Sequence, residues 1–197
     1  MSDTAMSAPV SARDEEKALG FWLYLMTDAI LFALLFATYV VMTVGTAGGP
    51  TGHDLFSLPR TFAETMLLLV SSTTFGFATL AAGRGEGGAA IRWLLLTALL
   101  GIGFVALELS EFAGMIAAGA GPDRSGFLSA FFALVGTHGL HVSAGILCIL
   151  VMVGQMLAKG LTAPVLSRLI RLGLFWHFLD IVWVGIFSVV YLPGVLP

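Results

Sequence analysis

Residues 126–158 read GFLSAFFALVGTHGLHVSAGILCILVMVGQMLA, and this stretch decides the fold because it contains no Lys, Arg, Asp or Glu. A helix rises about 1.5 Å per residue, so a stretch of this length is long enough to cross a hydrocarbon core about 30 Å thick. His138 and His141 lie three residues apart near its middle, and this spacing places both on one helix face. The stretch therefore predicts a membrane-spanning helix with a polar pair at mid-depth.

Four other predominantly apolar segments predict further spans: residues 19–44, 61–82, 91–117 and 166–195. A membrane β-barrel would need strands of about ten residues that alternate apolar and polar side chains, and the chain has none. We therefore expect an all-α integral membrane protein, a bundle of five transmembrane helices over residues 19–197. Residues 1–18 are polar and lack the order of a secretory signal, so they are expected to form a disordered cytoplasmic tail.

The composition agrees with a membrane protein. Of the 197 residues, 58% are hydrophobic and only 11% are charged, whereas soluble domains average about 25% charged residues. The net charge of −3 provides no basic surface for nucleic acid. The single cysteine, Cys148, excludes an internal disulfide, and its apolar neighbours predict a buried thiol.

The distribution of Lys and Arg predicts the orientation. The tail, the second and fourth links and the adjoining span ends hold Arg13, Lys17, Arg84, Arg92, Lys159, Arg168 and Arg171. The first and third links hold only Arg60 and Arg124. Because cytoplasmic segments are enriched in positive charge, we expect a cytoplasmic N-terminus and a periplasmic C-terminus.

Ionisable side chains recur inside the expected spans, where each costs a few kcal/mol unless it finds a partner. They are Asp28, Glu64, Glu108, Glu111, His138, His141, His177 and Asp180. Depth along the helices predicts two layers. An inner layer contains Asp28, His177 and Asp180, with His141 as a further candidate, and an outer layer contains the three glutamates. We expect these residues to form buried contacts between helices or with lipid.

The polar residues do not form a recognisable metal or catalytic site. Di-iron sites in helical bundles use Glu-x-x-His motifs, and the spans contain only Glu-x-x-Glu, His-x-x-His and His-x-x-Asp. We therefore expect no metal ligands and no catalytic residues. For Asp28, a packing role is favoured over a protonatable or headgroup-binding site. For Glu64, a place at the outer interface near its helix start is favoured over burial.

The chain resembles the haem–copper oxidase subunit III family. General family marks are THGLHV at residues 137–142 and WHFLDIVW at residues 176–183. GTAGGPTG at residues 45–52 and GPDRSGFLSAFFALVGTHG at residues 121–139 are similar to the branch of cytochrome o type ubiquinol oxidases. In the first span, GFWLYLMTDAILFALLFATYV places Asp28 where many cytochrome c oxidases carry a carbodiimide-reactive glutamate, which weakens any proton role inferred from that residue.

The resemblance implies a noncatalytic subunit of a proton-pumping ubiquinol oxidase in a bacterial inner membrane. The expected partners are subunit I as the main contact, subunit II, a small subunit IV and membrane lipids. Haem and copper are expected in subunit I and not in this chain, and a bound phospholipid is a further candidate. One alternative is subunit III of a cytochrome c oxidase, whose subunit II would carry a dinuclear copper site. A freestanding proton-relaying transporter is less favoured, because the sequence shows no repeated halves.

Overall fold

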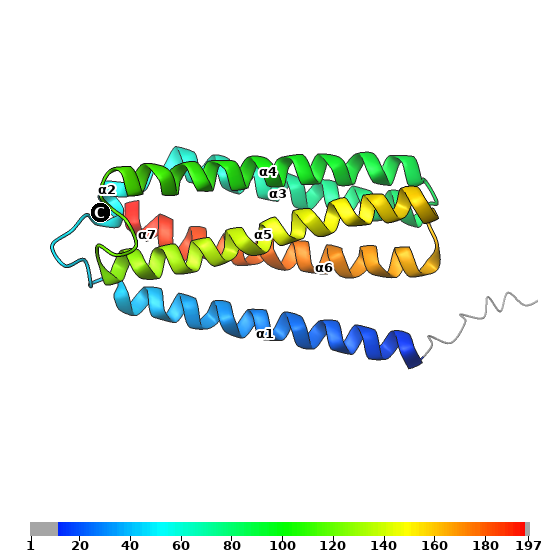
Figure 1. The fold of residues 1–197 in the computed structure, drawn as a ribbon, viewed down its shortest axis with the longest axis horizontal. Coiled ribbons are helices and arrows are strands. Elements are labelled where there is room, and N and C mark those ends of the chain that lie inside the picture. Colours follow the sequence, from blue (N-terminus) through cyan, green and yellow to red (C-terminus); the bar gives the residue numbers. More distant parts are fainter. Residues whose placement is uncertain (1–11, 196–197) are drawn as a thin grey trace, which may run out of the picture.

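The computed structural model describes residues 12–195, and these residues contain helices and no strands. Five helices are long and apolar enough to cross a membrane, which confirms the predicted fold class. They cover Leu19–Met42, Leu58–Gly83, Gly87–Ala117, Gly126–Lys159 and Ala163–Gly194. The odd number of spans places the two ends of the described chain at opposite ends of the bundle (Figure 1). Which end is cytoplasmic stays a prediction.

The secondary-structure elements follow in a simple order. The long helices are α1 (Ala12–Met42), α3 (Leu58–Gly83), α4 (Gly87–Ala117), α5 (Gly126–Lys159) and α6 (Ala163–Ile186), and the short elements are α2 (Gly52–Leu55), the π-helix η1 (Phe187–Tyr191) and α7 (Leu192–Val195). The helix α1 begins at Ala12, so residues 12–18 of the expected tail extend it, and that segment contains no proline or glycine to interrupt a helix. Residues 1–11 of the expected tail lie outside the described residues.

Local sequence explains where the long helices begin and end. The side chain of Ser125 accepts a hydrogen bond from the Leu128 N–H at 3.2 Å and caps the start of α5. Pro59 and Pro164 occupy the first turns of α3 and α6, where a missing N–H costs nothing. Gly160 ends α5 at φ +67°, a conformation that glycine adopts without strain.

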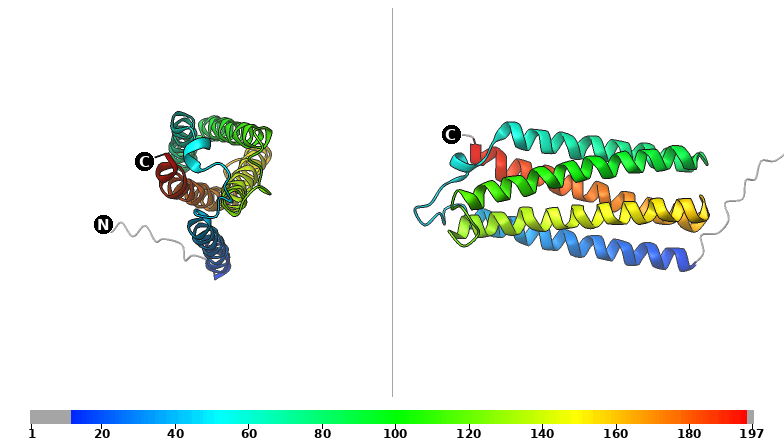
Figure 2. Two further views of the ribbon diagram at one scale, coloured as in Figure 1. Left: turned by 90° about the vertical axis from the view of Figure 1, so that its left-hand side faces the viewer. Right: turned by 45° about the horizontal axis from the view of Figure 1, so that its top comes forward.

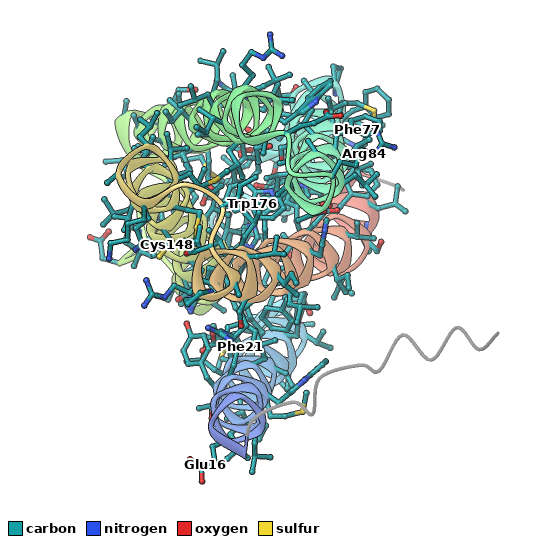
Figure 3. The ribbon with its side chains drawn as sticks, turned by 90° about the vertical axis from the view of Figure 1, so that its right-hand side faces the viewer. Glu16, Phe21, Phe77, Arg84, Cys148 and Trp176 are labelled. Atoms are coloured by element: carbon teal, nitrogen blue, oxygen red, sulfur yellow. The ribbon has the colours of Figure 1, made fainter. Side chains whose placement is uncertain are left out.

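Four helices, α3 to α6, form a square when viewed along the bundle, and α1 lies outside it against α5 and α6 (Figure 2). The core of the square is aromatic and aliphatic. Trp176 on α6 points into its centre (Figure 3), where the indole N–H donates to Ser71 on α3 at 3.1 Å. Trp183, two turns further on, donates to Thr65 on α3 at 3.1 Å. These bonds join α6 to α3 deep inside the bundle.

Candidate functional site

Three glutamates gather inside the square, in the half where α3 begins and α4 ends. Glu64 comes from α3, and Glu108 and Glu111 come from α4; they are 0%, 2% and 4% exposed. Their carboxyl groups lie close enough for each to affect the charge of the others. The hydroxyl of Tyr191 donates to Glu111 Oε2 at 3.0 Å. Glu64 is therefore buried within the bundle, whereas its depth relative to the membrane interface stays a prediction.

The π-helix η1 ends at Tyr191, whose side chain is fully buried. A π turn changes the register of the side chains that follow it, and such turns are frequent at functional positions. Near the same end of α3 and α4, the Arg60 guanidinium donates a hydrogen bond to the Ser110 hydroxyl at 2.5 Å. Tyr191 could not be singled out from the sequence, since an aromatic side chain near a helix end is common.

Several oxygens of the three glutamates have no partner among the described residues: both of Glu64, Oε2 of Glu108 and Oε1 of Glu111. Buried polar groups without partners are costly, and three adjacent negative charges in an apolar interior would repel one another strongly. The three carboxyl groups therefore cannot all be ionised together.

His138 is buried in the core and packs as an aromatic ring. It is 0% exposed, and its imidazole stacks on Trp183 with a centroid distance of 5.3 Å and an interplanar angle of 29°. The ring of Phe104 meets it edge-on at 5.7 Å. Neither ring nitrogen has a hydrogen-bond partner among residues 12–195. This environment suits a flat side chain that fills the core between three helices.

His141 faces the other way, toward α1. Its Nε2 lies 3.8 Å from Oδ2 of Asp28, a distance that suits ion pairing but is too long for a hydrogen bond. Its Nδ1 lies 2.7 Å from the carbonyl oxygen of Thr137. A carbonyl only accepts hydrogen bonds, so Nδ1 carries a proton. The His141 imidazole of α5 and the Asp28 carboxyl group of α1 thus face each other between the two helices.

The last polar group lies on the outer side of α3 and α6. Ser72 Oγ lies 2.7 Å from His177 Nδ1, and Asp180 is one turn further along α6. All three side chains are partly exposed. Oδ1 of Asp180 has no partner in the part of the chain that the structure describes. His177 and Asp180 thus do not join Asp28 and His141 in one contact network, although all four were expected in one layer.

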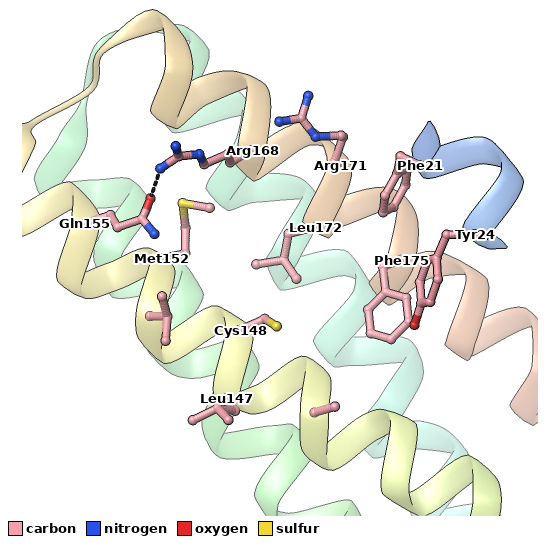
Figure 4. A pocket seen from close by; sticks show the side chains of 12 residues that line it. Phe21, Tyr24, Leu147, Cys148, Met152, Gln155, Arg168, Arg171, Leu172 and Phe175 are labelled. Carbon is pink, nitrogen blue, oxygen red and sulfur yellow. Dashed lines mark hydrogen bonds between the residues drawn. The ribbon is translucent and has the colours of Figure 1, made fainter. Parts of the chain in front are cut away.

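A groove opens between α1, α5 and α6 near the end where α6 begins (Figure 4). It has a volume of about 470 Å³, and its walls include Phe21, Leu147 and Phe175. Arg168 and Arg171 stand at one end, where Arg168 donates to Gln155 at 2.8 Å. The shape and chemistry suit an acyl chain with an anionic headgroup.

Cys148 lines the same groove and is exposed. The expected burial of its thiol was wrong, because apolar neighbours in a membrane span can face lipid as readily as protein. Within residues 12–195, no three His, Cys, Asp or Glu side chains are arranged to hold a metal ion. The polar contacts thus fall into three groups, all between helices: Tyr191 with Glu111, Asp28 with His141, and the partly exposed pair Ser72 and His177.

Comparison with known proteins gives consistent matches along nearly the whole chain. The family description "Cytochrome c oxidase subunit III" matches residues 9–195. A cytochrome bo(3) ubiquinol oxidase subunit 3 of Pseudomonas aeruginosa is 58% identical over 177 residues, covering 90% of this chain and 85% of that protein. The protein of the same name from Buchnera aphidicola is 46% identical, covering 92% of this chain and 93% of its own. A cytochrome c oxidase subunit 3 of Bacillus sp. PS3 is 41% identical, covering 99% and 96%.

Proposed function

This chain belongs to the cytochrome c oxidase subunit III family, and we propose that it works as a subunit without a redox centre, packed beside the haem–copper subunit of a bacterial ubiquinol oxidase. It is a multi-pass protein of the bacterial inner membrane and a subunit III of a ubiquinol oxidase in the aerobic respiratory chain. The observation that carries this function is the 58% identity to a ubiquinol oxidase subunit 3 over 90% of the chain.

The finer part of the proposal concerns what the chain does in that complex. The proposed partners are subunit I as the main contact, subunit II and a small subunit IV, with haem and copper in subunit I. The proposed buried polar contacts between helices or with lipid are Asp28, Glu64, Glu108, Glu111, His138, His141, His177 and Asp180. The hydrogen bond from Tyr191 to Glu111 and the pairs Asp28–His141 and Ser72–His177 support this role for the residues in them, since each links two helices. Subunit III of a cytochrome c oxidase remains the second candidate, because the Bacillus sp. PS3 relative carries that name.

Purification of the tagged chain in a mild detergent tests the main proposal. We expect larger oxidase subunits to co-purify, and all haem and copper to stay with them after dissociation. Copper in subunit II would assign the complex to the cytochrome c oxidases. A chain that purifies alone, or that keeps stoichiometric metal after separation, would refute the proposal.

A lipid contact in the groove between α1, α5 and α6 is the second part of the proposal. Arg168 and Arg171 stand at the groove end, at the depth of the headgroups on the expected cytoplasmic side. Replacing both with Gln should lower the co-purifying anionic phospholipid per complex, as measured by mass spectrometry of lipid extracts. Arg92→Gln is the matched control, since Arg92 is an exposed arginine at the same end but outside the groove. Equal lipid loss in both variants would exclude a site in the groove.

A further inference from the structure

The helix α1 packs closely against the bundle at its end. A methyl group added at Gly185 of α6 would lie 3.1 Å from the Phe36 ring. One added at Gly126 of α5 would lie 3.2 Å from the sulfur of Met42. Both distances are shorter than ordinary van der Waals contacts, which begin near 3.4 Å. The two glycines therefore let α5 and α6 hold the final part of α1, from Phe36 to Met42.

The beginning of α1 stands apart from α5 and α6. Figures 1 and 2 show that α1 diverges from the square of α3 to α6 toward the end of the bundle where α1 begins. The groove of about 470 Å³ lies at this end, and Phe21 and Tyr24 form its wall on α1. The Tyr24 ring lies 6.2 Å from the Phe175 ring of α6, centroid to centroid (Figure 4). One helix thus has a closely packed end and a beginning that borders a groove.

Space also remains at the middle of α1. Nε2 of His141 lies 3.8 Å from Oδ2 of Asp28, which is longer than the roughly 2.7–3.2 Å of a hydrogen bond between nitrogen and oxygen. Asp28 can therefore move toward α5 before the two side chains touch. The anchored end, the spaced middle and the groove together allow α1 to tilt about the Phe36 contact.

A small tilt of α1 would be enough to narrow the groove. At a rise of about 1.5 Å per residue, Phe21 lies about 22 Å from Phe36 along the helix. A tilt of about 7° about Phe36 would shift Phe21 by about 3 Å and Asp28 by about half as much. Membrane-spanning helices take tilts of about 0–40°, so a change of this size is ordinary.

The content of the groove should decide the tilt of α1. Helices in a membrane associate through van der Waals packing, because lipid removes the hydrophobic driving force between them. A wall without atoms opposite it loses those contacts, so α1 gains contacts by closing unless an acyl chain lies in the groove. Arg168 and Arg171 stand at the groove end, where they attract an anionic headgroup.

We propose that the first half of α1 is a lid over the groove, which rests on an anionic phospholipid when one is bound and closes toward α5 and α6 when none is. The part of α1 from Phe36 onward stays in place and acts as the pivot. The proposal rests on the proposed function and deepens its lipid contact, because it adds which wall of the groove moves.

Distances between spin labels in the intact oxidase test the lid. The labels are attached to cysteines in a Cys148→Ala background, since Cys148 is the single cysteine. The groove-end pair is Leu19 of α1 with Leu157 of α5, and the anchored-end pair is Val41 of α1 with Ala133 of α5; all four positions are exposed. In nanodiscs of phosphatidylcholine with phosphatidylglycerol, the groove-end distance should be about 3 Å longer than in phosphatidylcholine alone. The anchored-end distance should be the same in both.

Variants of the groove check the cause of the movement. Cys148→Trp places a large ring in the groove and should keep the longer groove-end distance in phosphatidylcholine alone. Leu150→Trp, on the same helix but outside the groove, is the matched control and should keep the response to phosphatidylglycerol. Arg168→Gln together with Arg171→Gln should abolish that response, because the headgroup loses its charge partners.

A groove-end distance that does not respond to phosphatidylglycerol, or an equal change in both pairs, would overturn the lid. The same conclusion follows if Cys148→Trp and Leu150→Trp respond alike. If the oxidase subunits still co-purify with the labelled chain in these cases, the proposed function stands without the lid. A labelled chain that purifies without those subunits would overturn both.

Discussion

Trp176 should be the least replaceable packing element of the bundle, because glycine backbones confine its ring on two sides. A methyl group added at Gly101 of α4 would lie 2.9 Å from the Trp176 ring, and one added at Gly145 of α5 would also lie 2.9 Å from it. Ordinary contacts begin near 3.4 Å. The ring cannot move aside, since it is 2% exposed and its N–H is held by Ser71.

The expected cost of Gly145→Ala follows from two opposing effects. Overpacking a filled core costs about 1–3 kcal/mol, while alanine in place of glycine in a helix stabilises by up to about 1 kcal/mol. The net destabilisation should therefore be about 0.5–2 kcal/mol, which for a chain of this size lowers the midpoint of thermal unfolding by about 1–8 °C. Gly154→Ala on the same helix is the control, because its methyl group would meet nothing within 4 Å.

The assay is heat-induced aggregation of this chain in the purified complex, followed by gel filtration in a mild detergent. Gly145→Ala should aggregate at a lower temperature than Gly154→Ala. Gly145→Ala should lower the aggregation temperature by less when Trp176 is replaced with Phe than when Trp176 is present, because the smaller ring leaves room for the methyl group. If Gly145→Ala proves as stable as Gly154→Ala, or if Trp176→Phe does not reduce its effect, the reasoning from ring confinement is refuted.

Two further predictions concern other parts of the chain. A methyl group at Gly139 would lie 2.5 Å from the carboxyl of Glu108, whereas one at Gly136 would make only an ordinary contact, so Gly139→Ala should lower the same aggregation temperature and Gly136→Ala should not. In the link between α1 and α3, hydrogen bonds from the backbone N–H and hydroxyl of Thr51 hold the pKa of Asp54 below its ordinary value. The stabilisation of α2 from this pair should thus be present above about pH 3.9 and be lost as the pH falls through the lower folded-state pKa. Amide hydrogen exchange of residues 51–56 measures it, and no difference between the protein and Asp54→Asn at pH 6 would contradict it.

The number and type of spans could be predicted because both depend on local chain properties. An apolar stretch longer than the hydrocarbon core either crosses the membrane or is buried inside a soluble protein. This chain has too few charged residues to form the surface of a soluble protein around five such stretches. Helix ends were less predictable. The last span continues through the π-helix η1 to Gly194, and no local signal in FSVVY distinguishes a π turn from an α turn.

The partners of the polar residues could not be predicted, because spacing along a helix defines a face but not the neighbour of that face. Asp28 and His177 were expected at one depth, yet Asp28 meets His141 on α5 while His177 meets Ser72 on α3. The rotation of each helix decides this, and it depends on the packing of residues such as Trp176. Serine and threonine are frequent in membrane spans, so the acceptors Ser71 and Thr65 could not be singled out from the sequence.

The helices of the bundle are held together with unequal strength, and the more weakly held helix depends more on the surroundings of the chain. The last span has hydrogen bonds to α3 and α4 through Trp176, Trp183 and Tyr191, and 44% of its most apolar window is buried. For α1 the buried share is only 22%, and its polar tie to the bundle is the longer Asp28–His141 contact. Apolar burial does not drive association where lipid is the solvent. The square of α3 to α6 is therefore the rigid unit, and α1 depends more than the others on what surrounds the chain.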